Sequence, residues 1–257
     1  MKNNNFENLR IIPRLDIKGT NVVKGVFTEG LKVVGDPKKL ATRYYKEGAD
    51  EIVLMDIVAS LYQRNLDFDL LKSVTDGIFI PITAGGGIRS IGDIDNAMRA
   101  GADKVAINTH FIKNPRFLSE AVHKFGAQCV VLSVEAKRVG PSEWEAYTDG
   151  GRERTGRDAI EWIRKATNLG VGEVVITSID HDGTRKGFDT ELISAITSFA
   201  TVPVVAHGGG GNYKTFSDIL ELARPDALAA ASVFHFQDYT ISELKKYLSK
   251  AKFNVRL

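Results

Sequence analysis

The sequence has almost no cysteine: Cys129 is the only one among 257 residues. A disulfide within the chain is therefore excluded, and a reducing, cytoplasmic location is expected. The apolar neighbours of Cys129 (QCVVLSV) favour a buried strand residue over a reactive nucleophile.

Long apolar runs and long runs of one charge are also missing. No stretch approaches the roughly 18 apolar residues of a membrane-spanning helix, and the first ten residues (MKNNNFENLR) lack the apolar core of a secretory signal. Lysine and arginine total 34 against 32 acidic residues, with no basic block, so neither a membrane nor a nucleic-acid partner is expected. No second histidine or cysteine stands near His207 at ligand spacing, so we expect no metal site and no cofactor.

The chain does contain short β-branched runs that alternate with amphipathic stretches, which is typical of parallel βαβ units. Eight rounds over 257 residues predict one (β/α)₈ barrel domain spanning residues 1–257. The expected strands are Arg10–Asp16, Glu51–Asp56, Phe79–Thr83, Lys104–Ile107, Gln128–Glu135, Glu173–Ser178, Val202–Ala206 and Ala227–Ala230.

An internal repeat relates the two halves of the predicted barrel. GADEIVLMDI resembles GVGEVVITSI, TAGGGIRSIGDI resembles AHGGGGNYKTFSDI, and two further segments match in the same order. A duplicated and fused half-barrel explains four matched strands. The alignment pairs Glu51 with Glu173, Gly85 with Gly208, Asp103 with Asp226, and Asp16 with Glu135.

Two glycine runs follow the third and seventh predicted strands, Gly85–Gly87 and Gly208–Gly211. A lone glycine triplet is most simply a tight turn. Two at symmetric barrel positions predict two phosphate sites, because glycine lets backbone N–H groups approach an anion closely. The residues expected to bind a substrate with two phosphates include Gly86, Gly87, Gly209 and Gly210, with Asn108, Thr109, Ala231 and Ser232 at the neighbouring strand ends.

Carboxylates end several of the predicted strands, where catalytic groups of such barrels lie. The repeat places Asp16 and Glu135 on opposite sides of the mouth, and we expect them to divide acid and base roles. Lys24, in the segment TNVVKGV predicted as a long loop, is an expected electrostatic partner. A capping role is the simpler interpretation of Asp182 in DHDGT.

Charged residues also stand at the strand starts, at the opposite end of the barrel. Strand alternation places Arg10, Ile12, Arg14 and Asp16 on the inner face. Arg10, Glu51, Lys104 and Glu173 would then meet at the barrel bottom, where buried charges need partners. They form either a salt-bridged plug or a gate over a narrow passage.

IIPRLDIKG, GADEIVLMDI, IPITAGGGIRS, WEAYTDGGRERTG, ITSIDHDGT and DALAAASVFHF together resemble the cyclase subunit family of imidazole glycerol phosphate synthase, almost end to end. The polar hairpin WEAYTDGGRERTG separates this family from the related phosphoribosyl isomerase. The resemblance implies that ammonia from a glutaminase subunit, docked at the barrel bottom, passes a gate of Arg10, Glu51, Lys104 and Glu173. It implies that Asp16 is a catalytic acid or base, Lys24 a loop lysine, and Asp182 and Gly183 part of the substrate site.

Three residues depart from the family pattern. Glu135 replaces an aspartate, Arg14 replaces a small residue and could pair with Glu135 or narrow the tunnel, and His207 replaces a serine that helps to hold the second phosphate. Such changes resemble paralogues that supply ammonia for the amidino modification of a surface-polysaccharide sugar. A further alternative is an ammonia conduit without catalysis of its own.

Overall fold

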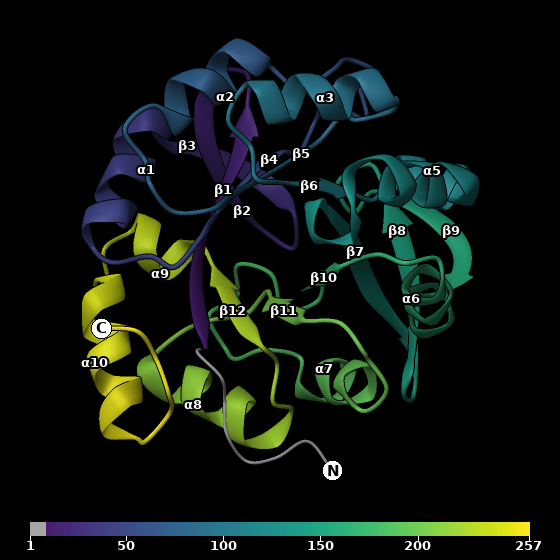
Figure 1. The fold of residues 1–257 in the computed structure, drawn as a ribbon. Coiled ribbons are helices and arrows are strands. Elements are labelled where there is room, and N and C mark those ends of the chain that lie inside the picture. Colours follow the sequence, from purple (N-terminus) through teal and green to yellow (C-terminus); the bar gives the residue numbers. More distant parts are fainter. Residues whose placement is uncertain (1–8) are drawn as a thin grey trace.

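The computed structural model describes residues 9–257, and eight parallel strands form a closed barrel wrapped by helices (Figure 1). Residues 1–8, most of the segment in which no secretory signal is expected, lie outside the described residues. The predicted (β/α)₈ fold is confirmed. In order around the barrel the strands are β1 (Arg10–Lys18), β4 (Ile52–Asp56), β5 (Ile82–Gly85), β6 (Lys104–Ile107), β7 (Val130–Gly140), β10 (Glu173–Ser178), β11 (Val204–His207) and β12 (Ala227–Ala230), which pairs again with β1.

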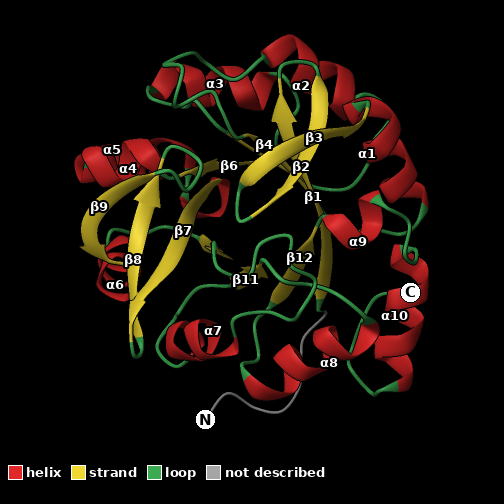
Figure 2. Ribbon diagram, turned by 180° about the vertical axis from the view of Figure 1, so that it is seen from behind, coloured by secondary structure: helices red, strands yellow, loops and turns green. Residues whose placement is uncertain are grey.

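Helices cover the outside of the barrel (Figures 1 and 2). Several begin at residues that the sequence marks as caps: Asp36 accepts a hydrogen bond from the Lys39 N–H, and Ser90 and Asp93 form a reciprocal capping box. The helices are α1 (Pro37–Lys46), α2 (Phe68–Thr75), α3 (Ile91–Arg99), α4 (Thr109–Lys113), α5 (Pro115–Phe125), α6 (Ala159–Asn168), α7 (Thr190–Thr197), α8 (Tyr213–Leu222), α9 (Ser232–His235) and α10 (Ile241–Lys250), with a short 3₁₀ turn at Ala127–Cys129. Across residues 9–257, none of the helices combines the length and apolar character needed to cross a membrane.

Two antiparallel hairpins extend from the ends of β1 and β7 (Figure 2). The first contains β2 (Asn21–Val26) and β3 (Glu29–Gly35), and the second contains β8 (Glu143–Thr148) and β9 (Glu153–Asp158). The second is the predicted polar hairpin. The expectation of a long loop around Lys24 is wrong, because Lys24 lies within β2 and is buried.

The barrel interior and the layer outside it form two separate hydrophobic clusters. Inward-facing side chains are small or branched, and helices pack on the outward-facing ones. The buried interior residues are Ile12, Val53, Met55, Ala106, Val131, Val175, Val205, Ala227 and Ala229.

In both halves a carboxylate just before one barrel strand forms a clasp to the preceding strand, by accepting a hydrogen bond from a backbone N–H at its start. Asp103 Oδ2 accepts a hydrogen bond from the Ile82 N–H at 2.8 Å, and Asp226 Oδ2 accepts one from the Val204 N–H at 2.9 Å. Asp50 makes the same bond, at 2.7 Å, to the Ile11 N–H. The repeat in the sequence therefore corresponds to repeated hydrogen bonding in the structure.

The register corrects the predicted repeat by one residue at the glycine loops. Met55 on β4 pairs with Gly85 on β5, and at the equivalent place in the second half Thr177 on β10 pairs with His207 on β11. Gly85 thus corresponds to His207, and Gly86, rather than Gly85, corresponds to Gly208. Three glycines can be aligned with a run of four in two ways, so the sequence alone does not fix the alignment of the two loops.

The strand bounds differ from the prediction most at β7 and β5: β7 continues past Glu135 to Gly140, where it enters the second hairpin, and β5 is shifted along the chain. It begins at Ile82 rather than Phe79, whose side chain is 84% exposed, because the Asp103 clasp fixes Ile82 as the first ladder residue. β11 likewise begins at Val204. Cys129 is not a buried strand residue: it ends the 3₁₀ turn before β7 and is partly exposed.

Candidate functional site

Three adjoining pockets, together called the trough, lie at the C-terminal ends of the barrel strands. The first-loop pocket contains Gly86 and Gly87, the central pocket contains Asp16 and Arg14, and the second-loop pocket contains Gly208–Gly210. The first-loop and central pockets share Ile57, Glu135 and Gly150, whereas the central and second-loop pockets share Lys24, Asp182 and His207. A ligand in the trough would therefore reach both glycine loops and both predicted catalytic carboxylates.

The glycine loops admit no other residue type at their closest points. A Cβ on Gly86 would lie 2.1 Å from the Asp56 carbonyl oxygen, and one on Gly209 would lie 2.0 Å from that of Gly187. Both glycines have φ near +100°. Tight packing alone explains these glycines, but each loop also opens onto an end of the trough.

The strand ends beside the glycine loops complete the two outer pockets. Asn108 and Thr109 line the first-loop pocket at the start of α4, and Ala231 and Ser232 line the second-loop pocket at the start of α9. Gly183 also lines the second-loop pocket. The structure therefore brings every predicted phosphate-binding residue to the trough.

Asp16 lies in the central pocket between two cations. Its Oδ1 accepts a hydrogen bond from Arg14 Nε at 2.8 Å, and its Oδ2 lies 3.9 Å from Lys24 Nζ. Burial alone would raise the pKa of Asp16, but the charges of Arg14 and Lys24 outweigh burial and hold the pKa at about 2. Asp16 is ionised at neutral pH and can act as a base.

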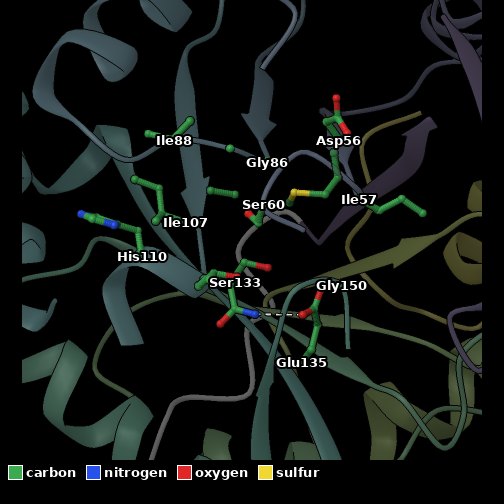
Figure 3. A pocket seen from close by; sticks show the side chains of 15 residues that line it. Asp56, Ile57, Ser60, Gly86, Ile88, Ile107, His110, Ser133, Glu135 and Gly150 are labelled. Atoms are coloured by element: carbon green, nitrogen blue, oxygen red, sulfur yellow. Dashed lines mark hydrogen bonds between the residues drawn. The ribbon is translucent and has the colours of Figure 1, made fainter. Parts of the chain in front are cut away.

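Glu135 faces the trough from β7, and among the residues that the structure describes it forms no ion pair with a lysine or arginine. Its Oε2 accepts a hydrogen bond from Asn108 Nδ2 at 2.8 Å, the dashed line in Figure 3, where Gly86 and Glu135 line opposite sides of the first-loop pocket. Burial raises the pKa of Glu135 to about 7, against the opposing effects of the Arg14 charge and the Asn108 hydrogen bond. Near neutral pH Glu135 is partly protonated and can donate a proton, so the two carboxyl groups have separated pKa values.

This separation predicts a pH dependence of stability. A pKa raised from 4.5 to about 7 means that the folded state favours the protonated carboxyl. Protonated Glu135 stabilises the fold fully below pH 4.5, its ordinary pKa. This contribution to the free energy of unfolding, about 3 kcal/mol, is lost as the pH rises through about 7, the pKa in the folded state. We expect Glu135→Gln to remove this loss, as measured by urea unfolding at about pH 4 and about pH 8. An equal loss in the variant would contradict the assignment. The contribution of Asp16 has the opposite sign and is lost at lower pH.

Lys24 and Asp182 form a buried ion pair at the junction of the central and second-loop pockets. Lys24 Nζ lies 2.7 Å from Asp182 Oδ1 and 2.9 Å from Oδ2. The pair joins β2 to the loop after β10, so Asp182 is an ion-pair partner rather than a simple cap. It also fixes Lys24 over Asp16.

The four charged residues at the other end of the barrel make an alternating ring. Glu51 lies 2.8 Å from Arg10 and 2.7 Å from Lys104, and Glu173 lies 3.0 Å from Arg10 and 3.1 Å from Lys104. Thr83 donates a further hydrogen bond to Glu51 at 2.5 Å. Each charge has two opposite neighbours, which is the pairing that the strand alternation predicts.

Sequence reasoning missed several residues of the trough. Thr177 in the central pocket and Ser60, Ser133 and Gly150 in the first-loop pocket line it, although none of them forms a motif. Ser133 follows Val131 by two residues on β7, so strand alternation is the signal that could have found it.

Of the two possibilities stated for Arg14, pairing with Glu135 is wrong: within residues 9–257 its ion-pair partner is Asp16. The Arg14 guanidinium donates to Asp16 and, through Nη1, to Thr177 Oγ1 at 3.0 Å. Its contact with Asp16 forms within β1 itself, two residues along one face of the strand.

Within residues 9–257 no group of three or more histidine, cysteine, aspartate and glutamate side chains could hold a metal ion.

Comparison with known proteins places the chain among close relatives. Residues 10–240 match a family described as "Histidine biosynthesis protein". "Imidazole glycerol phosphate synthase subunit HisF" of Legionella pneumophila is 53% identical over 212 residues, covering 82% of this chain and all of the relative. The protein of the same name in Clostridium botulinum (strain Langeland / NCTC 10281 / Type F) is 47% identical over 249 residues, covering 96% of this chain and 98% of the relative.

Proposed function

The chain belongs to the histidine biosynthesis protein family, and we propose that it is the cyclase subunit of an imidazole glycerol phosphate synthase. The observation that carries the proposal is the trough, which joins two glycine loops through a pair of carboxyl groups with separated pKa values. A glycine loop at each end of the trough suits a substrate with a phosphate at each end.

The substrate of this reaction is a phosphoribulosyl aminoimidazole carboxamide with two phosphates. Ammonia closes the imidazole ring, and cleavage gives imidazole glycerol phosphate and an aminoimidazole carboxamide ribotide. Backbone N–H groups of the loops at Gly86–Gly87 and Gly209–Gly210 would hold the phosphates, with Thr109 and Ser232 adding hydroxyl donors.

Asp16 and Glu135 would divide the proton transfers between them. Asp16, ionised beside Arg14 and Lys24, takes a proton from the attacking nitrogen. Glu135, partly protonated at neutral pH, returns a proton to the leaving group from the other wall of the trough. The Asn108 hydrogen bond fixes the longer side chain that Glu135 has in place of the usual aspartate.

Ammonia would enter from the barrel bottom, where the ring of Arg10, Glu51, Lys104 and Glu173 lies. The relatives are named as subunits, which supports a complex, and we propose a glutaminase partner docked at this end. The ring would act as the gate for ammonia. We place the complex in the cytoplasm, in agreement with the single cysteine.

The direct test supplies ammonium salt to the isolated chain with the ribulosyl substrate at mildly alkaline pH, where free ammonia is available. We expect both products to form without a partner, and glutamine to support turnover only after a glutaminase is added. Folded protein that makes no product would contradict the cyclase assignment. Conversion of the aldose isomer alone would indicate a phosphoribosyl isomerase.

A second candidate is favoured by the residues at the centre of the trough. Arg14, Glu135 and His207 depart together from the family pattern and line the central pocket. They would suit a paralogue that supplies ammonia for amidino modification of a polysaccharide sugar. In that case ammonia would still pass the ring while the ribulosyl substrate gives no product.

A further inference from the structure

The Arg14 side chain crosses from β1 to β10 within the central pocket of the trough. Its guanidinium is buried, with 4% of the residue exposed, and it donates from Nε to Asp16 and from Nη1 to Thr177 Oγ1. Thr177 Oγ1 lies in turn 3.1 Å from Nδ1 of His207 on the neighbouring strand β11. The three side chains make one hydrogen-bonded chain from the base Asp16 to the second glycine loop.

The donors and acceptors of this chain fix its proton positions. A guanidinium can only donate, so the Thr177 oxygen accepts from Arg14. The hydroxyl proton is then free for the other partner of Thr177 among residues 9–257, which is His207 Nδ1. If Nδ1 carried the ring proton, the Thr177 hydroxyl would have no acceptor among these residues, so the contact favours an accepting Nδ1 and a neutral His207 with its proton on Nε2.

His207 is neutral for physical reasons visible around it. Burial lowers its pKa well below the ordinary value, and the charges of Arg14 and Lys24 lower it further. Asp16 opposes this, and His235 adds a small lowering. A neutral ring has one N–H, so the choice of tautomer decides which way it can donate.

The His207 ring lines both the central and the second-loop pocket. It lines the second-loop pocket together with Gly208, Gly209 and Ser232. Among the residues that the structure describes, no hydrogen bond is formed by His207 Nε2, whereas Nδ1 is occupied by Thr177. An N–H on Nε2 would be available to an anion held by the glycine loop.

We propose that Arg14 is a positioning residue which, through Thr177, fixes His207 as its Nε2–H tautomer and so supplies a ring N–H donor to an anionic group, of the phosphate class, at the second glycine loop. The inference rests on the proposed function, which places one of the two substrate phosphates there. Arg14 and His207, which both depart from the family pattern, would then act together: Arg14 fixes the tautomer, and His207 donates the hydrogen bond.

The test reads the tautomer directly, by ¹⁵N NMR of the His207 ring, with His207→Gln assigning the signals. We expect the Nε2–H tautomer in the wild-type protein, and a shift of Nε2 on addition of inorganic phosphate. Arg14→Met removes the donor and frees the Thr177 hydroxyl to turn, so that it can either donate to Nδ1 or accept from Nδ1–H. That variant should show both tautomers; with equal populations, half of the rings present Nε2–H and phosphate should bind about twofold more weakly.

Substitutions at Thr177 keep the test valid even if Arg14→Met does not fold. Thr177→Val has nearly the same shape without the hydroxyl and should also lose the fixed tautomer, whereas Thr177→Ser should retain it. In turnover assays, Thr177→Val should raise KM for the bisphosphate more than it lowers kcat. An Nδ1–H tautomer in the wild type, or unchanged tautomer and phosphate affinity in both Arg14→Met and Thr177→Val, would overturn the proposal. None of the NMR readouts needs turnover, so they separate this inference from failure of the cyclase assignment.

Discussion

Asp16→Asn is expected to lower ammonia-dependent turnover by about 10²–10⁴-fold, the range for loss of a general acid or base. The amide has the shape of the carboxylate, and its oxygen can still accept from Arg14 Nε, which lies 2.8 Å from Asp16 Oδ1. It cannot take up a proton from the substrate. Steady-state kinetics with ammonium salt should therefore show the loss in kcat, with KM little changed.

Asp180→Asn is the matched control for this experiment. Asp180 also follows a barrel strand, but its carboxylate accepts the Arg138 N–H at 2.8 Å and lines none of the three pockets. Its turnover should stay close to that of the wild type. Near-normal turnover of Asp16→Asn would show that another residue carries the proton transfer.

Glu51→Gln is expected to destabilise the fold by about 3 kcal/mol, because removing one partner leaves buried charges uncompensated. Glu51 is 2% exposed and contacts both cations of the ring and Thr83. The amide would also face Arg10 and Lys104 with donor groups of its own. The midpoint of urea unfolding should fall while the m-value stays the same.

Asp76→Asn tests whether any lost ion pair has this effect. The Lys38–Asp76 pair has a similar distance, 2.9 Å, but its side chains are 48% and 76% exposed. Solvent screens such a pair, so the midpoint should hardly move. If Glu51→Gln also leaves the midpoint of urea unfolding almost unchanged, the ring of four charges does not stabilise the barrel.

The sequence was sufficient for those features that follow from periodicity. Strand alternation predicted that Arg10, Glu51, Lys104 and Glu173 meet, and the repeat predicted that Asp16 and Glu135 face one trough. Both depend on which face of a strand a residue occupies, and the sequence gives this because successive side chains of a strand point to opposite faces.

Features that depend on the reach of a side chain could not be predicted in this way. Arg14 was placed inside the barrel, but its length lets it bend to Asp16 on its own strand and extend to Thr177 rather than contact Glu135. Lys24 lies in a short strand, β2, whose pairing with β1 and β3 depends on contacts between segments that the local sequence does not show. The prediction includes Phe79 in β5 because an apolar residue near the start of a strand gives no sign, in the sequence, of whether its side chain is buried.

The register of the repeat has a final consequence, for substrate polarity. Arg14, Thr177 and His207 occupy places that in the other half belong to Ser133, Met55 and Gly85. A trough with two alike ends would accept a bisphosphate in either orientation, whereas the proposed mechanism needs the one orientation that brings the reacting atoms to the proposed base, Asp16. Because these side chains differ between the halves, the two ends of the trough differ chemically. A barrel built by duplication can therefore bind a bisphosphate in a single orientation.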